Sequence, residues 1–157
     1  MNTLNWFKQA LPNPTAVNFT VQLGVHLEEI SETLDALVLN SEDQQSLAVA
    51  HSRIEGLKLL ADSLKVGGIY VDNVQSVPEL IDGLADQHVT LTGLAHIAGL
   101  DFEGAKAEVD RSNFSKFVGG KPIFNGNGKI AKGPDYVPPN LESFIPAVEA
   151  QVKKLFG

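Results

Sequence analysis

The chain contains 157 residues, 43% of them hydrophobic, with no cysteine and a formal net charge of −7. The length fits a single domain over residues 1–157 with a substantial core, and the absence of cysteine excludes disulfides, thiolate metal sites and cysteine nucleophiles. The acidic balance argues against nucleic-acid polymers as partners, and without a long apolar run or a signal-like N-terminus we expect a cytoplasmic protein that does not associate with membranes.

Apolar residues recur at helical spacing through most of the chain and predict an all-α fold. A short helical arm is expected up to Ala10, followed by a connector rich in proline and asparagine. A longer helix follows over about residues 15–39, and another reaches Lys65, where Gly67 and Gly68 end it. The residues expected to face the core in the first of these two are Leu23, Leu27, Ile30, Leu34 and Leu37.

Three more helices are predicted in the second half of the chain. One spans about residues 77–98, and another begins after the N-cap Asp101 and extends to about Lys116. A loop over residues 119–133 follows, whose two Asn-Gly steps favour a hairpin turn, and a last amphipathic helix covers about residues 141–156. The residues expected to point inward from the 77–98 helix are Leu80, Leu84, Leu91, Leu94 and Ala98.

Clustered carboxylates mark two of these helices, one group in the helix over residues 15–39 and another in the helix over 77–98. The groups are Glu28, Glu29 and Glu32, and Glu79, Asp82 and Asp86. Residues three and four apart share a helix face, so each group forms an acidic stripe whose like charges repel unless it faces open water or holds a cation. Carboxylate oxygens suit magnesium, and the stripes therefore predict a metal site between the two helices. The alternatives are two solvated faces and, for Glu79, a capping box with Ser76.

The loop over residues 119–133 is the most basic part of this acidic chain, because it carries Lys121, Lys129 and Lys132. Loops of this length within a compact domain are commonly functional, so a phosphate-binding role is one interpretation. Solvated lysines on a surface hairpin are the other.

Four motifs occur in order along the chain. They are Glu28-Glu29-x-x-Glu32, Glu79-x-x-Asp82-x-x-x-Asp86, Arg111-Ser112-Asn113-x-Ser115-Lys116 and Gly128-Lys129-x-x-Lys132-Gly133-Pro134. In combination they resemble the all-α nucleoside triphosphate pyrophosphohydrolases, the MazG-like group related to dimeric dUTPases and phosphoribosyl-ATP pyrophosphohydrolases, and in particular its single-domain bacterial and phage branch. The resemblance covers about residues 7–141 and implies a MazG-like four-helix-type bundle with a short C-terminal hairpin loop and a terminal helix.

The resemblance implies hydrolysis of (deoxy)nucleoside triphosphates between the α and β phosphates, giving a nucleoside monophosphate and pyrophosphate, as in nucleotide-pool cleansing. Magnesium, with manganese as the alternative, would neutralise the triphosphate and orient a water, and Glu28 or Glu29 would take the water's proton. The carboxylates implied as metal ligands are Glu29, Glu32, Glu79, Asp82 and Asp86. Two registers compete for the family's Glu-x-x-Asp motif, because Gly83 stands where one of them needs an acid, and the direct ligands on this helix therefore stay open.

The resemblance also implies a set of substrate-binding residues, namely Asn113, Lys116, Arg111, Lys129 and Lys132. Lys116 would contact phosphate, and Asn113 would contact sugar, base or phosphate. Alternatively, Asn113 caps its helix and Arg111 pairs with Asp110 or Glu108.

Helices with two usable faces predict a homodimer or homotetramer. Two other functions stay open at this point: phosphoribosyl-ATP hydrolysis, and a non-catalytic helical protein that binds nucleotide or metal. The preferred base and sugar do not follow from periodicity, because a specificity pocket combines side chains from several helices.

Overall fold

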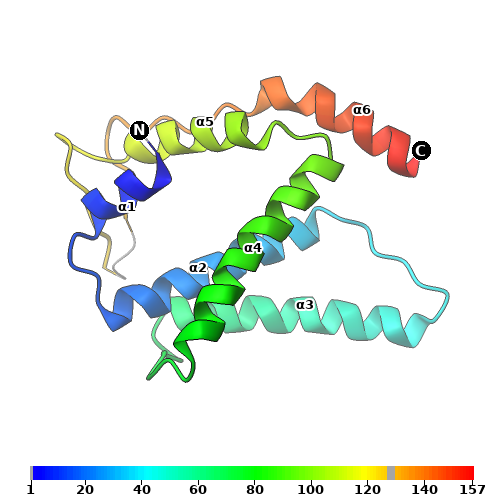
Figure 1. Ribbon diagram of the computed structural model, residues 1–157, viewed down its shortest axis with the longest axis horizontal. Coiled ribbons are helices and arrows are strands. Elements are labelled where there is room, and N and C mark those ends of the chain that lie inside the picture. The colour runs from blue at the N-terminus through cyan, green and yellow to red at the C-terminus, as the bar shows by residue number, and fades with distance from the viewer. Residues whose placement is uncertain (1, 127–129) are drawn as a thin grey trace. The chain divides into compact units, whose positions relative to one another are not determined.

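The structure is a computed structural model that describes residues 2–126 and 130–157. The described residues form six α-helices, which confirms the predicted all-α fold class (Figure 1). None of the described helices has the combination of length and apolar composition that a membrane crossing requires. The helices are α1 (Thr3–Ala10), α2 (Ala16–Asp35), α3 (Gln44–Lys65), α4 (Val77–Ile97), α5 (Phe102–Phe114) and α6 (Ile145–Phe156), with the short 3-10 helix η1 (Glu142–Phe144) directly before α6.

The helix starts are set by capping side chains. Thr15 and Asn18 form a reciprocal capping box at the start of α2, in which each side chain bonds the backbone of the other. Asp43 accepts bonds from two backbone amides at the start of α3, and Asp101 accepts one from Gly104 at the start of α5. These bonds satisfy amides that the first helical turn leaves unpaired, which explains why the predicted starts of α2 and α5 agree closely with the observed ones.

The chain divides into two compact units. The first unit combines residues 2–12, 74–125 and 130–157, and therefore contains α1, α4, α5 and α6. The second unit combines residues 13–73 with Gly126, and contains α2 and α3. The single domain over residues 1–157 and the four-helix bundle both stay predictions, since each would combine elements of the two units.

In the second unit, α2 packs against α3 through small residues. Thr20, Gly24 and Ser31 are the buried residues of α2, and a Cβ at Gly24 would lie 2.8 Å from the backbone oxygen of Ala61. The two helices therefore approach closely where α2 lacks a side chain. Of the expected stripe, Leu23, Leu27 and Leu34 are half-buried, whereas Ile30 is 37% exposed and Leu37, beyond the end of α2, is 52% exposed.

Two lysines of α3 link the pair of helices. Lys58 Nζ lies 2.9 Å from a carboxylate oxygen of Asp35, and Lys65 Nζ lies 2.6 Å from one of Glu28. The lysines are seven residues apart on α3 and their partners are seven residues apart on α2, in reverse order. Seven residues make nearly two helical turns, so both ion pairs fix the same antiparallel register.

The core of the first unit forms around Trp6. Its ring stacks on Phe117 with centroids 5.9 Å apart, and Ala10 completes the buried cluster. The indole Nε1 donates to the backbone oxygen of Asn113 at 2.9 Å, which satisfies the one polar atom of the buried side chain. Thr3 adds a second link from α1 to α5 by donating to the buried Asp110 at 2.7 Å.

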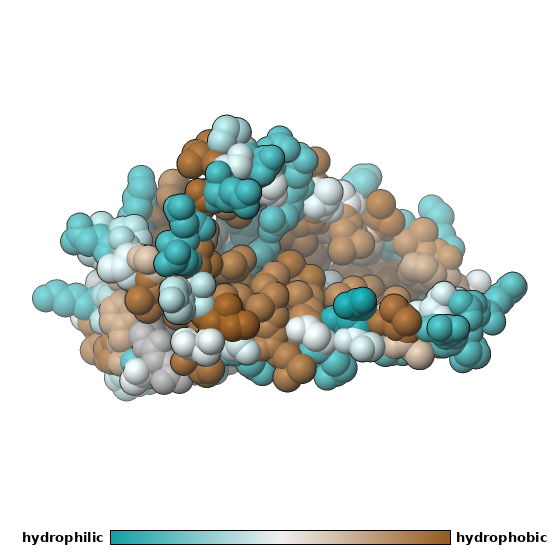
Figure 2. Space-filling model, turned by 90° about the horizontal axis from the view of Figure 1, so that it is seen from below, coloured by the Kyte–Doolittle hydropathy of each residue, from teal (hydrophilic) through white to brown (hydrophobic). Residues whose placement is uncertain are grey.

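The end of α4, the start of α5 and α6 meet at a corner of the first unit. Gly99 has a φ of +75°, and Gln151 of α6 donates to the backbone oxygen of Ile97 at 3.1 Å. Most of α4 is exposed, including Leu84, Leu91 and Leu94, so the expectation that these leucines point into a core is wrong for the chain as described. Figure 2 shows exposed apolar residues beside hydrophilic ones on the face in view.

Candidate functional site

The acidic residues of α2 occupy two different environments. Glu28 is half-buried and accepts a charge-assisted bond from Lys65 of α3 at 2.6 Å. Glu29 and Glu32 are exposed. The two adjacent glutamates therefore have different surroundings. Glu28 is bonded to the neighbouring helix, whereas Glu29 is exposed.

Lys65 is the residue at this cluster that the sequence analysis missed. Its Nζ also lies 2.8 Å from Asp62, one turn earlier on α3, and its side chain is only 15% exposed. The hydrogen bonds that Lys65 donates to Asp62 and, second, to Glu28 raise the pKa of Lys65 above its usual range, so its ammonium group stays charged beside the acidic stripe. The seven-residue spacing of Lys58 and Lys65 was the available signal, because it matches the spacing of their α2 partners.

The second acidic stripe lies on the first half of α4. Glu79, Asp82 and Asp86 are all exposed. At the helix start, Ser76 Oγ accepts a bond from the Glu79 amide at 3.4 Å, which is the first half of the capping box considered as an alternative role for Glu79. The stripe therefore presents carboxylates to solvent from one helix face.

The predicted metal ligands belong to different units. Glu29 and Glu32 are in the second unit, whereas Glu79, Asp82 and Asp86 are in the first. Within each unit, the described histidine, aspartate and glutamate side chains form no group of three that could hold a metal ion. Carboxylate oxygens are nevertheless the donors that magnesium prefers, so the donor chemistry fits the ion, and the shared site stays a prediction.

At the end of α5, the predicted substrate residues contact each other. Lys116 Nζ donates to Asn113 Oδ1 at 2.7 Å and lies 5.9 Å from the centroid of the Trp6 ring. Both side chains are half-buried. The amide oxygen and the ammonium group are thus held as a unit at the edge of the aromatic core.

Arg111 forms the ion pair that the sequence analysis considered as its alternative role. Its guanidinium donates two bonds to Glu108, at 2.8 and 2.7 Å, and one to the backbone oxygen of Pro138 at 3.0 Å. Arg111 and, second, the backbone amide of Asn140 lower the pKa of Glu108 to about 2. The pair therefore ties the segment after the hairpin loop to α5.

The basic loop begins with a tight turn. Val118 and Lys121 pair across Gly119 and Gly120, which both have positive φ, and Lys121 is exposed. A second pairing, between Phe124 and Ile130, agrees with the predicted hairpin.

Of the other two lysines of this loop, the structure describes Lys132 but not Lys129. Lys129, a predicted phosphate partner, lies outside the described residues together with Gly128. Lys132 lies over the ring of Tyr136, with its Nζ 4.8 Å from the ring centroid, a distance suited to a cation–π interaction.

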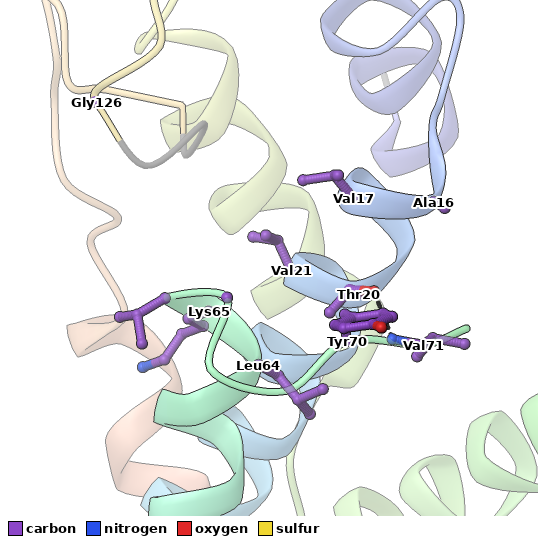
Figure 3. A pocket seen from close by; sticks show the side chains of 11 residues that line it. Ala16, Val17, Thr20, Val21, Leu64, Lys65, Tyr70, Val71 and Gly126 are labelled. Atoms are coloured by element: carbon purple, nitrogen blue, oxygen red, sulfur yellow. Dashed lines mark hydrogen bonds between the residues drawn. The ribbon is translucent and has the colours of Figure 1, made fainter.

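The second unit contains a pocket of about 620 Å³ between the start of α2 and the end of α3. Val17 and Val21 project from α2 on successive turns, and the ring of Tyr70 lies beside Thr20 (Figure 3). The volume is within the range of small-molecule sites. Periodicity could not reveal this pocket, because one wall is the non-helical segment after α3.

Comparison of the chain with protein-family models, curated proteins and solved structures gives no match. The resemblance to the MazG-like pyrophosphohydrolases is therefore carried by the four motifs and their order alone. The roles that it implies for individual residues stay predictions.

Proposed function

We propose that the protein is a magnesium-dependent nucleoside triphosphate pyrophosphohydrolase that converts (deoxy)nucleoside triphosphates to monophosphates and pyrophosphate, in a nucleotide-pool cleansing role. The observation that carries the proposal is the presence of two acidic stripes on the long helices α2 and α4, with Glu29, Glu32, Asp82 and Asp86 exposed. Clustered carboxylates repel each other, and a divalent cation bound to a triphosphate would relieve that repulsion.

The proposed reaction needs few groups. Magnesium, with manganese as an alternative, neutralises phosphate charge when it is bound. The oxygen of a water forms a bond to the α- or the β-phosphorus, and the P–O bond between that phosphorus and the α–β bridging oxygen breaks. The leaving group, which is pyrophosphate in the first case and the nucleoside monophosphate in the second, keeps the electron pair of the broken bond. The water's proton passes to a carboxylate, for which we favour Glu29, because Glu28 already accepts a charge-assisted bond from Lys65.

The motif at the end of α5 supports the proposed binding of the substrate's phosphate groups. Lys116 carries a positive charge next to the Asn113 amide, and such a charge would complement a phosphate oxygen. Arg111 is engaged by Glu108, so its contribution to phosphate binding would require exchange of partners.

The experiment is release of pyrophosphate from a panel of ribo- and deoxyribonucleoside triphosphates, measured with magnesium and with chelator. We expect metal-dependent turnover that falls by about 100-fold or more in Glu29→Ala and in Glu32→Ala, because each removes a charge that holds the ion. The Glu42→Gln variant, in the exposed connection between α2 and α3, is the matched control and should retain wild-type turnover. Full activity in both glutamate variants, or no activity with any triphosphate, would contradict the proposal.

Self-association into a homodimer or homotetramer is part of the proposal. Large apolar side chains on α4 are exposed, with Ile81 at 64% and Leu84 at 55%. Contiguous exposed apolar surface is typical of interaction sites.

A further inference from the structure

A pocket adjoins the acidic stripe of α2. It lies within the second unit, between the first turns of α2 and the last turn of α3, and it has a volume of about 620 Å³. Its lining includes Val17, Val21, Leu64, Lys65, Tyr70 and Val71.

The walls are suited to a flat, weakly polar ring. Val17, Val21 and Leu64 provide aliphatic surface, and Tyr70 provides an aromatic ring that is 71% exposed. Aromatic rings stack on nucleobases without regard to base identity. Among the described residues that line the pocket, Lys65 is the charged one.

The aromatic wall is attached to α2 by a hydrogen bond. The Val71 amide donates to Thr20 Oγ1 at 3.0 Å (Figure 3), and Thr20 is 3% exposed. The segment carrying Tyr70 is thus held against the helix, although it belongs to no helix itself. A ring that is fixed beside the pocket loses less conformational entropy when a ligand stacks on it.

The pocket and the carboxylates share one face of α2. Val17, Val21, Glu28 and Glu32 follow one another at spacings of four, seven and four residues, which place them on the same side of a helix. Glu28 lies about 10 Å along the helix axis from Val21. A nucleoside and its first phosphate cover such a distance.

Lys65 lies between the pocket and the carboxylates that share this face of α2. It lines the pocket, and its Nζ donates to Glu28 at 2.6 Å. The ammonium group of Lys65 therefore lies where the pocket ends and the carboxylates begin. A ligand with a neutral ring at one end and an anionic phosphate chain at the other matches this order of apolar groups, an ammonium group and then Glu32, one of the proposed metal ligands.

We infer that this pocket is the nucleoside subsite of the protein, with the base against Tyr70 and the valines of α2 and the phosphates extending past Lys65 toward Glu28 and Glu32. The inference is built on the proposed function, because only a nucleotide substrate uses both parts of the face. It assigns base selection to the second unit, and it predicts selection mainly by ring size and stacking, since aliphatic walls discriminate by shape.

The test is the Val21→Phe variant, which fills the pocket. We expect KM for the preferred triphosphate to rise by about tenfold or more with kcat within about threefold, because uniform ground-state binding is removed. Val49→Phe is the matched control, since Val49 is 50% exposed on α3 and does not line the pocket. Both variants are first compared with wild type by circular dichroism and melting temperature. An unchanged KM in a folded Val21→Phe variant would overturn the inference.

A second measurement separates the subsite from the catalytic proposal. Methyl NMR of the wild-type protein is recorded with a nucleoside monophosphate and, separately, with pyrophosphate. Shifts at the methyl groups of Val17, Val21, Leu64 and Val71 with the monophosphate, and none with pyrophosphate, are expected, with Leu59 as an exposed reference. If these shifts occur but no triphosphate is hydrolysed, the enzyme proposal fails and the subsite stands. If hydrolysis occurs without these shifts, the subsite is wrong and the enzyme proposal stands.

Discussion

Glu108 and Arg111 illustrate how a single ion pair organises the end of α5. Glu108 accepts two bonds from Arg111 and one, at 2.7 Å, from the Asn140 amide. These donors favour the ionised carboxylate, and they lower its pKa from 4.5 to about 2. The stabilisation from this group is therefore present above the unfolded pKa of 4.5 and is lost as the pH falls through about 2.

A pH prediction follows for Glu108→Gln. The difference in melting temperature between wild type and variant should be largest above about pH 5, and it should shrink as the pH falls below 4.5 toward 2. Thermal melts followed by circular dichroism at several pH values measure this difference. Glu149→Gln, an exposed substitution on α6, is the matched control. A difference that does not change with pH would show that Glu108 is not held ionised by its donors.

The sequence could suggest partners at this scale but could not choose among them. Arg111 had Asp110 and Glu108 as alternative partners, and Glu108 is the observed one because it is three residues away on the same helix face. Asp110 is instead buried and bonded to Thr3, more than 100 residues earlier. The spacing of neighbouring residues in the sequence does not indicate a contact between residues so far apart.

Gly24 determines how α2 meets α3. The missing side chain allows the backbone of Ala61 to come within 2.8 Å of the position that a Cβ would take. Close approach of two helix backbones improves packing, and any side chain at the crossing forces the helices apart.

Gly24→Ala should consequently destabilise the protein by about 1–3 kcal/mol, the usual cost of overpacking a tight contact. Gly56→Ala is the control on the partner helix. A Cβ at Gly56 meets nothing within 4 Å, so the same substitution there should stabilise by about 0.5–1 kcal/mol through helix propensity. Urea unfolding of both variants gives the two free energies. Equal effects at the two glycines would argue against a close crossing at Gly24.

Helix positions could be predicted well, whereas helix faces could not. The starts of α2, α3 and α5 follow from Thr15, Asp43 and Asp101, whose side chains cap the backbone locally. The buried face of α2 is different, because Thr20 and Gly24 carry no hydrophobic signal and are buried by the partner helix. Counting leucines therefore identified half-buried residues beside this face, such as Leu23 and Leu27, but not the small residues that are fully buried.

For the whole molecule, the exposed apolar residues of α4 allow a test of self-association. Light scattering coupled to gel filtration should give a mass that is a multiple of 16.8 kDa. Leu84→Glu, which places a charge on a side chain that is 55% exposed, should lower that mass. Val38→Glu, at a side chain that is 97% exposed, is the control and should leave the mass unchanged. A wild-type mass of one chain would contradict the proposed oligomer.

The exposed helix positions of the candidate carboxylates could be predicted from the sequence. Glu32 and Asp86 lie on exposed helix faces, where helical periodicity placed them. Whether the two stripes meet depends on contacts between separate units, and no pattern within one helix encodes such contacts. The pocket beside Tyr70 was missed for a related reason, since Tyr70 follows the end of α3 and has no periodic neighbours.

The burial of Trp6 has a consequence for the order of events during synthesis. Its ring partner is Phe117 and its hydrogen-bond acceptor is Asn113, 107 residues later. The α2–α3 hairpin, in contrast, is complete when Lys65 has been made. Chains grow from the N-terminus at about 5–20 residues per second, so the hairpin has all its partners several seconds earlier. The helix α1 is therefore made before the α2–α3 hairpin but acquires its native neighbours only after it, and the Trp6 indole lacks its native partners for that interval.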